Sequence, residues 1–157
     1  REEVVSFSQG YLPPSASAYL ALSADADLTS GPVAAQTGTI QASFVAENGM
    51  QLVEYATPEE TVAAVKNGEA VAVLADKDYL APMAAESGGS LVLLEREEII
   101  GGGIGLAFRK SDDELRAKFD AAIKSMKCDG TLDVMITKPE YFGPEAKTWG
   151  DAGKEGC

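Results

Sequence analysis

The chain has 157 residues, is 45% hydrophobic and carries a formal net charge of −12. This apolar content can bury a core, which predicts one domain, or one domain with an appendage, and argues against a disordered chain. The negative charge disfavours nucleic acid and anionic membrane surfaces as partners. Histidine is absent, which removes Ser-His and Cys-His nucleophile pairs and imidazole metal sites. We expect no metal and no cofactor.

The start of the sequence shows no targeting or membrane segment. Its first residues, REEVV, lack the apolar stretch of a signal peptide, and no window is long and apolar enough to span a bilayer. We therefore expect no direct membrane insertion, and we expect that the signal peptide of an exported protein has been removed.

Strands and helices are predicted to alternate through the first two thirds of the chain. Two β-prone runs, at residues 3–7 and 17–23, flank a segment with two prolines and a glycine, which marks a turn or an extended crossing. Further strands are predicted at 33–35, 51–55, 70–75 and 91–94, and helices at 39–48, 58–68 and from 77 to about 87. This order is typical of an α/β fold with a mostly parallel sheet flanked by helices.

Local signals support these elements. Thr57, Pro58 and Glu60 form the pattern of a capping box with proline at the first helical position. Residues 70–75, AVAVLA, are apolar throughout, as in a strand covered on both faces, and the run stops on the carboxylate of Asp76. The glycines at 101–103 precede a strand instead of a helix, so they do not form a dinucleotide-binding loop.

The last third of the chain is predicted to be helical, with an irregular tail. Apolar side chains recur on one face of a helix over residues 112–130, and a second helix begins at Thr131 and ends before Pro139. The two cysteines, Cys128 and Cys157, fit no zinc pattern. In an oxidising compartment they can form a disulfide that contributes roughly 3 to 4 kcal/mol; the alternative is two free thiols.

Four motifs in order carry a resemblance to a known family. VVSFSQGY shortly after Arg1, AAQTGTIQASF, NGEAVAVLAD and the long GGGIGLAFRKSDDELRAKFDAAIKSMKCDGTLDVM follow one another across residues 1 to about 142. Together they resemble the polar amino-acid family of periplasmic solute-binding proteins that feed ABC transporters. The resemblance implies the type 2 periplasmic binding fold, binding of an amino acid between two lobes without catalysis, a membrane permease as partner, and a periplasmic location.

The resemblance also implies a division of the chain. Residues 1–11 correspond to a crossing segment, 12–102 to the complete second lobe, 103–142 to the return strand and helices of the first lobe, and 143–157 to a C-terminal tail. The N-terminal half of the first lobe is then absent from this sequence, and the helical stripe that includes Leu115, Phe119, Ile123 and Met126 lacks its usual partner. The implied hinge residues are Phe7, Ser8, Tyr11, Gly103 and Gly105.

The same resemblance assigns ligand-binding roles to residues of the second lobe. Asp76 matches the aspartate that accepts hydrogen bonds from the ligand's α-ammonium; the alternative is that it only caps the following helix. Gly38, Thr39 and Ile40 match the helix start whose N–H groups, with the threonine hydroxyl, bind the α-carboxylate; the alternative is an ordinary N-cap at Thr39. Gln41 falls where relatives place a polar ligand contact.

Arg1 matches the arginine that clamps the ligand's α-carboxylate with its planar fork, although as the first residue it can instead be solvated. Two other functions remain open at this point. Enzymes that resemble dehydratases use the same scaffold and would need an acid or base in the cleft, and a sensory ligand-binding module would use the same lobe.

Overall fold

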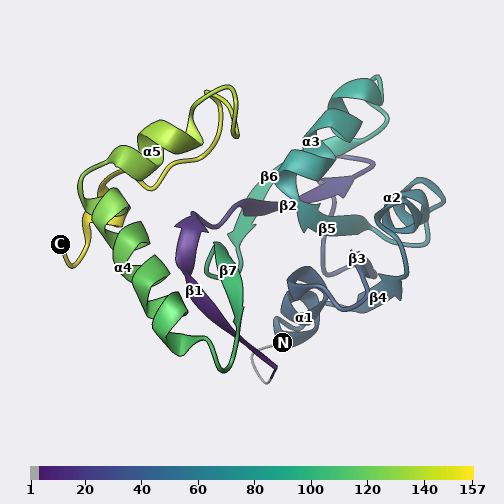
Figure 1. Ribbon diagram of the computed structural model, residues 1–157. Coiled ribbons are helices and arrows are strands. Elements are labelled where there is room, and N and C mark those ends of the chain that lie inside the picture. The colour runs from purple at the N-terminus through teal and green to yellow at the C-terminus, as the bar shows by residue number, and fades with distance from the viewer. Residues whose placement is uncertain (1–3) are drawn as a thin grey trace. The chain divides into compact units, whose positions relative to one another are not determined.

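The computed structural model describes residues 4–157, which form two compact units (Figure 1). The central unit is the continuous segment Ser15–Gly101. The terminal unit combines the described residues up to Pro14 with Gly102–Cys157. The predicted α/β fold class is confirmed.

The central unit is a five-stranded sheet with helices between its strands. Its strands are β2 (Ala16–Ala21), β3 (Val33–Gln36), β4 (Leu52–Tyr55), β5 (Ala72–Asp76) and β6 (Val92–Ile99), and its helices are α1 (Ile40–Glu47), α2 (Pro58–Lys66) and α3 (Lys77–Glu86). The strand order is β4-β3-β5-β2-β6.

The sheet is mixed, whereas the alternating elements predicted mostly parallel pairing. The strands β3, β4 and β5, which helices α1 and α2 link in sequence, run parallel: β3 lies between the other two and pairs with both. In contrast, β2 pairs antiparallel with β5 and with β6. No helix leads from β2 into β3, so the crossover that forces parallel pairing is missing there.

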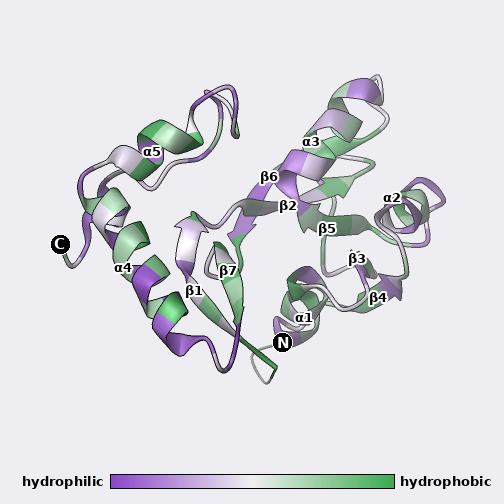
Figure 2. Ribbon diagram, viewed as in Figure 1, coloured by the Kyte–Doolittle hydropathy of each residue, from purple (hydrophilic) through white to green (hydrophobic). Residues whose placement is uncertain are grey.

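The centre of this sheet is buried on both faces. Successive side chains of a strand point to opposite faces, and Val73 and Leu74 of β5 accordingly belong to two different buried clusters. Helices α2 and α3 contribute to the first cluster and α1 contributes to the second. Figure 2 shows β5 as a hydrophobic strand. Because both faces of the strand are covered, the run 70–75 contains no polar residue.

Helix α2 begins as the sequence predicts. The Thr57 side chain accepts a hydrogen bond from the Glu60 N–H, and the Glu60 carboxylate accepts one from the Thr57 N–H, so the capping box is confirmed. Pro58 is the first helical residue. This arrangement satisfies two N–H groups that would otherwise lack partners at the helix start.

The terminal unit contains a two-stranded ribbon and helices. Its elements are β1 (Val5–Leu12), β7 (Ile104–Arg109), α4 (Asp113–Cys128), α5 (Thr131–Ile136) and a 3-10 turn at Gly150–Lys154. The strands pair antiparallel from Val5 and Arg109 to Leu12 and Ile104, with register shifts on both sides of Gly10.

The C-terminal tail is anchored to the helices. Cys128 and Cys157 form the predicted disulfide, with 5.8 Å between their Cα atoms. The Trp149 indole N–H donates to the Tyr11 carbonyl (3.0 Å), and its ring lies 3.6 Å from the Lys127 ammonium. Burial lowers the pKa of Lys127. The tail is therefore a packed part of this unit despite its lack of sequence periodicity.

The predicted apolar stripe of α4 is covered over only part of its length. Ile123 is buried with Leu132 and Ile136 of α5, and Met126 and Trp149 pack against this cluster. Toward the start of α4, however, Leu115 and Phe119 remain 49% and 43% exposed. The tail and α5 thus supply a partner for the C-terminal half of the stripe.

Candidate functional site

A pocket of about 250 Å³ lies in the central unit at the carboxyl ends of its parallel strands. The chain leaves β3 through α1 toward β4 on one side, and it leaves β5 through α3 toward β6 on the other. Between two such strands the connections diverge and leave a crevice, which is where open α/β sheets bind ligands. Thr39 and Gln41, after β3, and Asp76, at the end of β5, line this pocket.

Asp76 is exposed and held by a neighbouring amide. The Gln41 Nε2 donates one hydrogen bond to Asp76 Oδ1 (2.9 Å) and another to Ser17 Oγ (3.1 Å). Asp76 occupies the N-cap position of α3, but its side chain makes no capping hydrogen bond. The alternative role, in which this side chain only caps α3, is therefore not seen in the structure.

The turn after β3 presents free N–H groups. The N–H groups of Gly38, Ile40 and Gln41 have no hydrogen-bond acceptor within the described part of the chain. Those of Ile40 and Gln41 belong to the first turn of α1, where helices lack internal acceptors. The first turn of α1 contains no acidic residue, so no carboxylate within that turn repels an anion.

Thr39 is an N-cap, the alternative that the sequence left open. Its hydroxyl donates to the Gln36 carbonyl (2.7 Å) and accepts from the Ala42 N–H (3.2 Å). Because the hydroxyl proton is already used, only backbone groups of this turn are available to an anion. Gly38 has φ of 75°, a conformation that favours glycine, and Ile40 is 52% exposed.

Several pocket residues were not predicted from the sequence. Gln36, Thr61 and Tyr79 also line the pocket. Ser17, on β2, accepts a hydrogen bond from the Gln41 side-chain amide. The Tyr79 hydroxyl is buried without a hydrogen-bond partner among residues 4–157, and burial, together with the charge of Glu59, raises its pKa. Tyr79 follows Asp76 by three residues, a helical spacing that could have placed it on the same side of α3.

The predicted hinge residues lie on the ribbon of the terminal unit. Phe7, Ser8 and Tyr11 belong to β1, and Gly105 belongs to β7. Gly103 precedes β7 with φ of 90°, and a Cβ there would lie 2.3 Å from the Leu12 carbonyl oxygen, so only glycine fits this position. Arg1, the predicted carboxylate clamp, lies outside the described residues.

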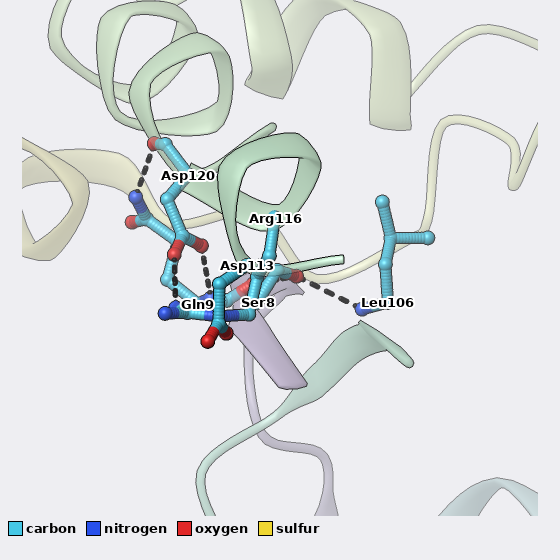
Figure 3. Close-up of polar contacts among 6 residues, drawn as sticks. All are labelled: Ser8, Gln9, Leu106, Asp113, Arg116 and Asp120. Carbon is cyan, nitrogen blue, oxygen red and sulfur yellow. Dashed lines mark hydrogen bonds and ion pairs between the residues drawn. The ribbon is translucent and has the colours of Figure 1, made fainter. Parts of the chain in front are cut away.

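Side chains replace the ladder bonds where the register of the ribbon shifts (Figure 3). The Ser8 hydroxyl donates to the Gln9 carbonyl (2.7 Å) and accepts from the Leu106 N–H (2.9 Å). Asp120 of α4 accepts the Gln9 N–H at 2.7 Å, and Arg116 pairs with the same carboxylate at 2.9 Å. The irregular strand is thereby fixed to α4 and not left as loose chain.

In chemical terms, the central unit places a carboxylate and a row of free N–H donors on neighbouring strand ends. A carboxylate suits a cation, and N–H groups at a helix start suit an anion. No lysine or arginine is among the residues that line the pocket. The described residues also contain no group of three or more potential metal ligands, and none of their helices could cross a bilayer.

The fold is a mixed α/β fold with a pocket at its strand ends, the place where open α/β sheets bind ligands. The model of the bacterial extracellular solute-binding proteins, family 3, matches residues 1–143. The chain belongs to this family, and the predicted resemblance is confirmed.

Solved structures of similar proteins agree. A periplasmic His/Glu/Gln/Arg/opine family-binding protein from Silicibacter pomeroyi, in complex with lysine, is 59% identical with a TM-score of 0.75, and the match covers 94% of this chain and 66% of that one. An amino-acid ABC transporter substrate-binding protein from Streptococcus pneumoniae, bound to L-arginine, is 28% identical with a TM-score of 0.62, covering 85% of this chain and 60% of that one.

An arginine transport-system periplasmic binding protein from Legionella pneumophila is 24% identical with a TM-score of 0.68, which shows the shared fold; 90% of this chain and 67% of that one are covered. The chain therefore spans about two thirds of the length of these proteins.

Proposed function

We propose that this chain is the greater part of an extracytoplasmic amino-acid-binding protein that supplies an ABC importer through its membrane permease. In this proposal the central unit is the second lobe, the ribbon of β1 and β7 is the crossing between lobes, and the ligand is enclosed by lobe closure. The location is periplasmic, no cofactor takes part, and no covalent chemistry is performed.

One observation carries the proposal. At a single edge of the sheet, Asp76 lines the same pocket as Thr39 and Gln41, which belong to the helix start with the free N–H groups. An α-amino acid carries an ammonium and a carboxylate on one carbon, so it complements both groups at once. Charge-assisted hydrogen bonds of this kind are strong where water is excluded.

We propose an amino acid with a cationic side chain as the ligand. The relative at 59% identity is described in complex with lysine. The net charge of −12 raises the local concentration of cations around the protein, and no cationic side chain lines the pocket that would repel such a ligand. L-lysine and L-arginine are therefore the first probes, with L-glutamine and L-glutamate as comparisons.

The test is calorimetric titration of these amino acids into the protein in its full length. We expect Asp76→Asn to weaken binding by at least about tenfold, because a charged partner is removed from the ligand's ammonium. Asp78→Asn is the matched control: it removes another exposed carboxylate, two residues along and outside the pocket lining, and should leave the affinity unchanged.

Equal affinities of the wild type and Asp76→Asn, with both variants folded, would refute the assignment of Asp76. Heat released by none of the four amino acids would refute amino-acid binding itself. A turnover assay on small carboxylic acids such as prephenate separates binding from catalysis on this scaffold, and measurable product would replace the binding proposal with an enzymatic one.

A further inference from the structure

We propose that Ser17 and Gln41 form a positioning pair that holds the Asp76 carboxylate in the orientation in which it meets the ligand's ammonium group. The inference rests on the proposed function. It changes the role of Gln41 from a direct ligand contact to a residue that acts through Asp76, and it gives Ser17 a role that no motif indicates.

The three residues come together from three elements. Ser17 of β2 is the register partner of Asp76 on β5, and Gln41 lies in the first turn of α1. Ser17 and Gln41 are buried, 1% and 6% exposed, whereas Asp76 is exposed. Two buried polar side chains thus support one exposed carboxylate at the rim of the pocket.

The hydrogen bonds of the Gln41 amide leave it no free donor. A side-chain amide nitrogen carries two N–H groups, and here one points to Ser17 Oγ (3.1 Å) and the other to Asp76 Oδ1 (2.9 Å). The reverse orientation of the amide would place its oxygen against the carboxylate. The negative charge of Asp76 and the hydroxyl of Ser17 therefore fix Gln41, and Gln41 fixes Asp76.

The pair leaves part of Asp76 for a ligand. Only Oδ1 accepts a hydrogen bond within residues 4–157, and no described lysine or arginine pairs with this carboxylate. Oδ2 is thus available to an ammonium group. A carboxylate already held in one rotamer loses less conformational freedom when it binds, which increases affinity without any new ligand contact.

A double-mutant cycle tests the pair in the full-length protein with L-lysine as the probe. We expect Gln41→Leu to weaken binding roughly 3- to 10-fold, because an oriented hydrogen bond to a charged group is lost, and Ser17→Ala to weaken it less. In the Asp76→Asn background both substitutions should lose most of their effect, since residues that act through one another are not additive. Gln51→Leu, at an exposed glutamine outside the pocket lining, is the control.

A ligand-free measurement separates this inference from the proposed function. The two side-chain N–H signals of Gln41, identified by their absence from the Gln41→Leu spectrum, should exchange slowly with water in the wild type. Both Ser17→Ala and Asp76→Asn should accelerate that exchange. This result is expected whether or not L-lysine binds.

The outcomes are distinct. Loss of affinity in Gln41→Leu that persists at full size beside Asp76→Asn would show direct ligand contact and overturn the pair. Unchanged affinity in Gln41→Leu when Asp76→Asn binds weakly would overturn it as well, as would fast exchange of the Gln41 amide in the wild type. If Gln41→Leu does not fold, Ser17→Ala and Gln41→Glu, which opposes Asp76 with a second negative charge, provide the same comparison. If none of the four amino acids binds and the amide exchanges slowly, the proposed function is rejected and the pair is retained.

Discussion

Opening the disulfide between Cys128 and Cys157 should destabilise the terminal unit. The bridge closes a loop with a sequence separation of 29, and the loss of unfolded-chain entropy for a loop of that length corresponds to about 3 to 4 kcal/mol. The bond also tethers the tail that carries Trp149, whose indole N–H is bonded to the Tyr11 carbonyl. Without it, this tail is held only by its hydrogen bonds and packing.

Trp149 provides the assay, because it is the single tryptophan of the sequence. Its fluorescence reports release of the tail during urea unfolding, and for a slope of about 2 kcal/mol/M the lost energy corresponds to a midpoint lower by roughly 1.5 to 2 M. Protein that has been reduced and alkylated should match Cys128→Ser/Cys157→Ser. Identical urea midpoints for the bridged and the alkylated protein would refute the entropic argument.

Two further predictions concern polar side chains. Asp120→Ala should destabilise the terminal unit by about 1 to 3 kcal/mol in the same urea unfolding, because the Gln9 N–H loses its acceptor. The control Asp113→Ala removes an exposed ion pair with Arg116 and should cost less than about 0.5 kcal/mol. Equal losses of stability in the two variants would contradict the role of Asp120 as the acceptor for Gln9. Burial, followed by the charge of Glu98, raises the pKa of Tyr19 to about 12. The folded state therefore holds this proton more tightly than the unfolded chain does. This difference contributes about 1 to 2 kcal/mol of stability, which is fully present below pH 10 and should be lost as the pH rises from 10 to 12. If the free energy of unfolding of Tyr19→Phe falls with pH in this range as steeply as that of the wild type, the prediction is wrong.

The sequence predicted those features that local rules determine. The capping box at Thr57 needs only residues three apart, and the strand that ends at Asp76 follows from an unbroken apolar run. The disulfide was one of two open alternatives, and the structure contains it. The family resemblance rested on four motifs in order, and the match over residues 1–143 confirms it.

Features that depend on distant pairings were not predictable in the same way. The antiparallel position of β2 between β5 and β6 depends on which strand edges meet, and no residue of β2 specifies it. Ser17 is the first residue of the predicted run 17–23 and belongs to no motif, so its contact with Gln41 carries no signal in the sequence. For Thr39, the same residue type suits an N-cap and an anion contact, and only the hydrogen bonds of its hydroxyl decide between them.

The two units differ in how their chain segments become available during synthesis. All of the central unit lies in Ser15–Gly101, whereas the terminal unit needs segments from both sides of it. A ribosome therefore completes the central unit before it has made the segment Gly102–Cys157 of the terminal unit, and domains generally fold as units in the order of synthesis. β1 must wait for its partner β7, but a folded central unit replaces a long flexible loop and lowers the entropic cost of joining them. The central unit, with its pocket, can thus form before β1 pairs with β7.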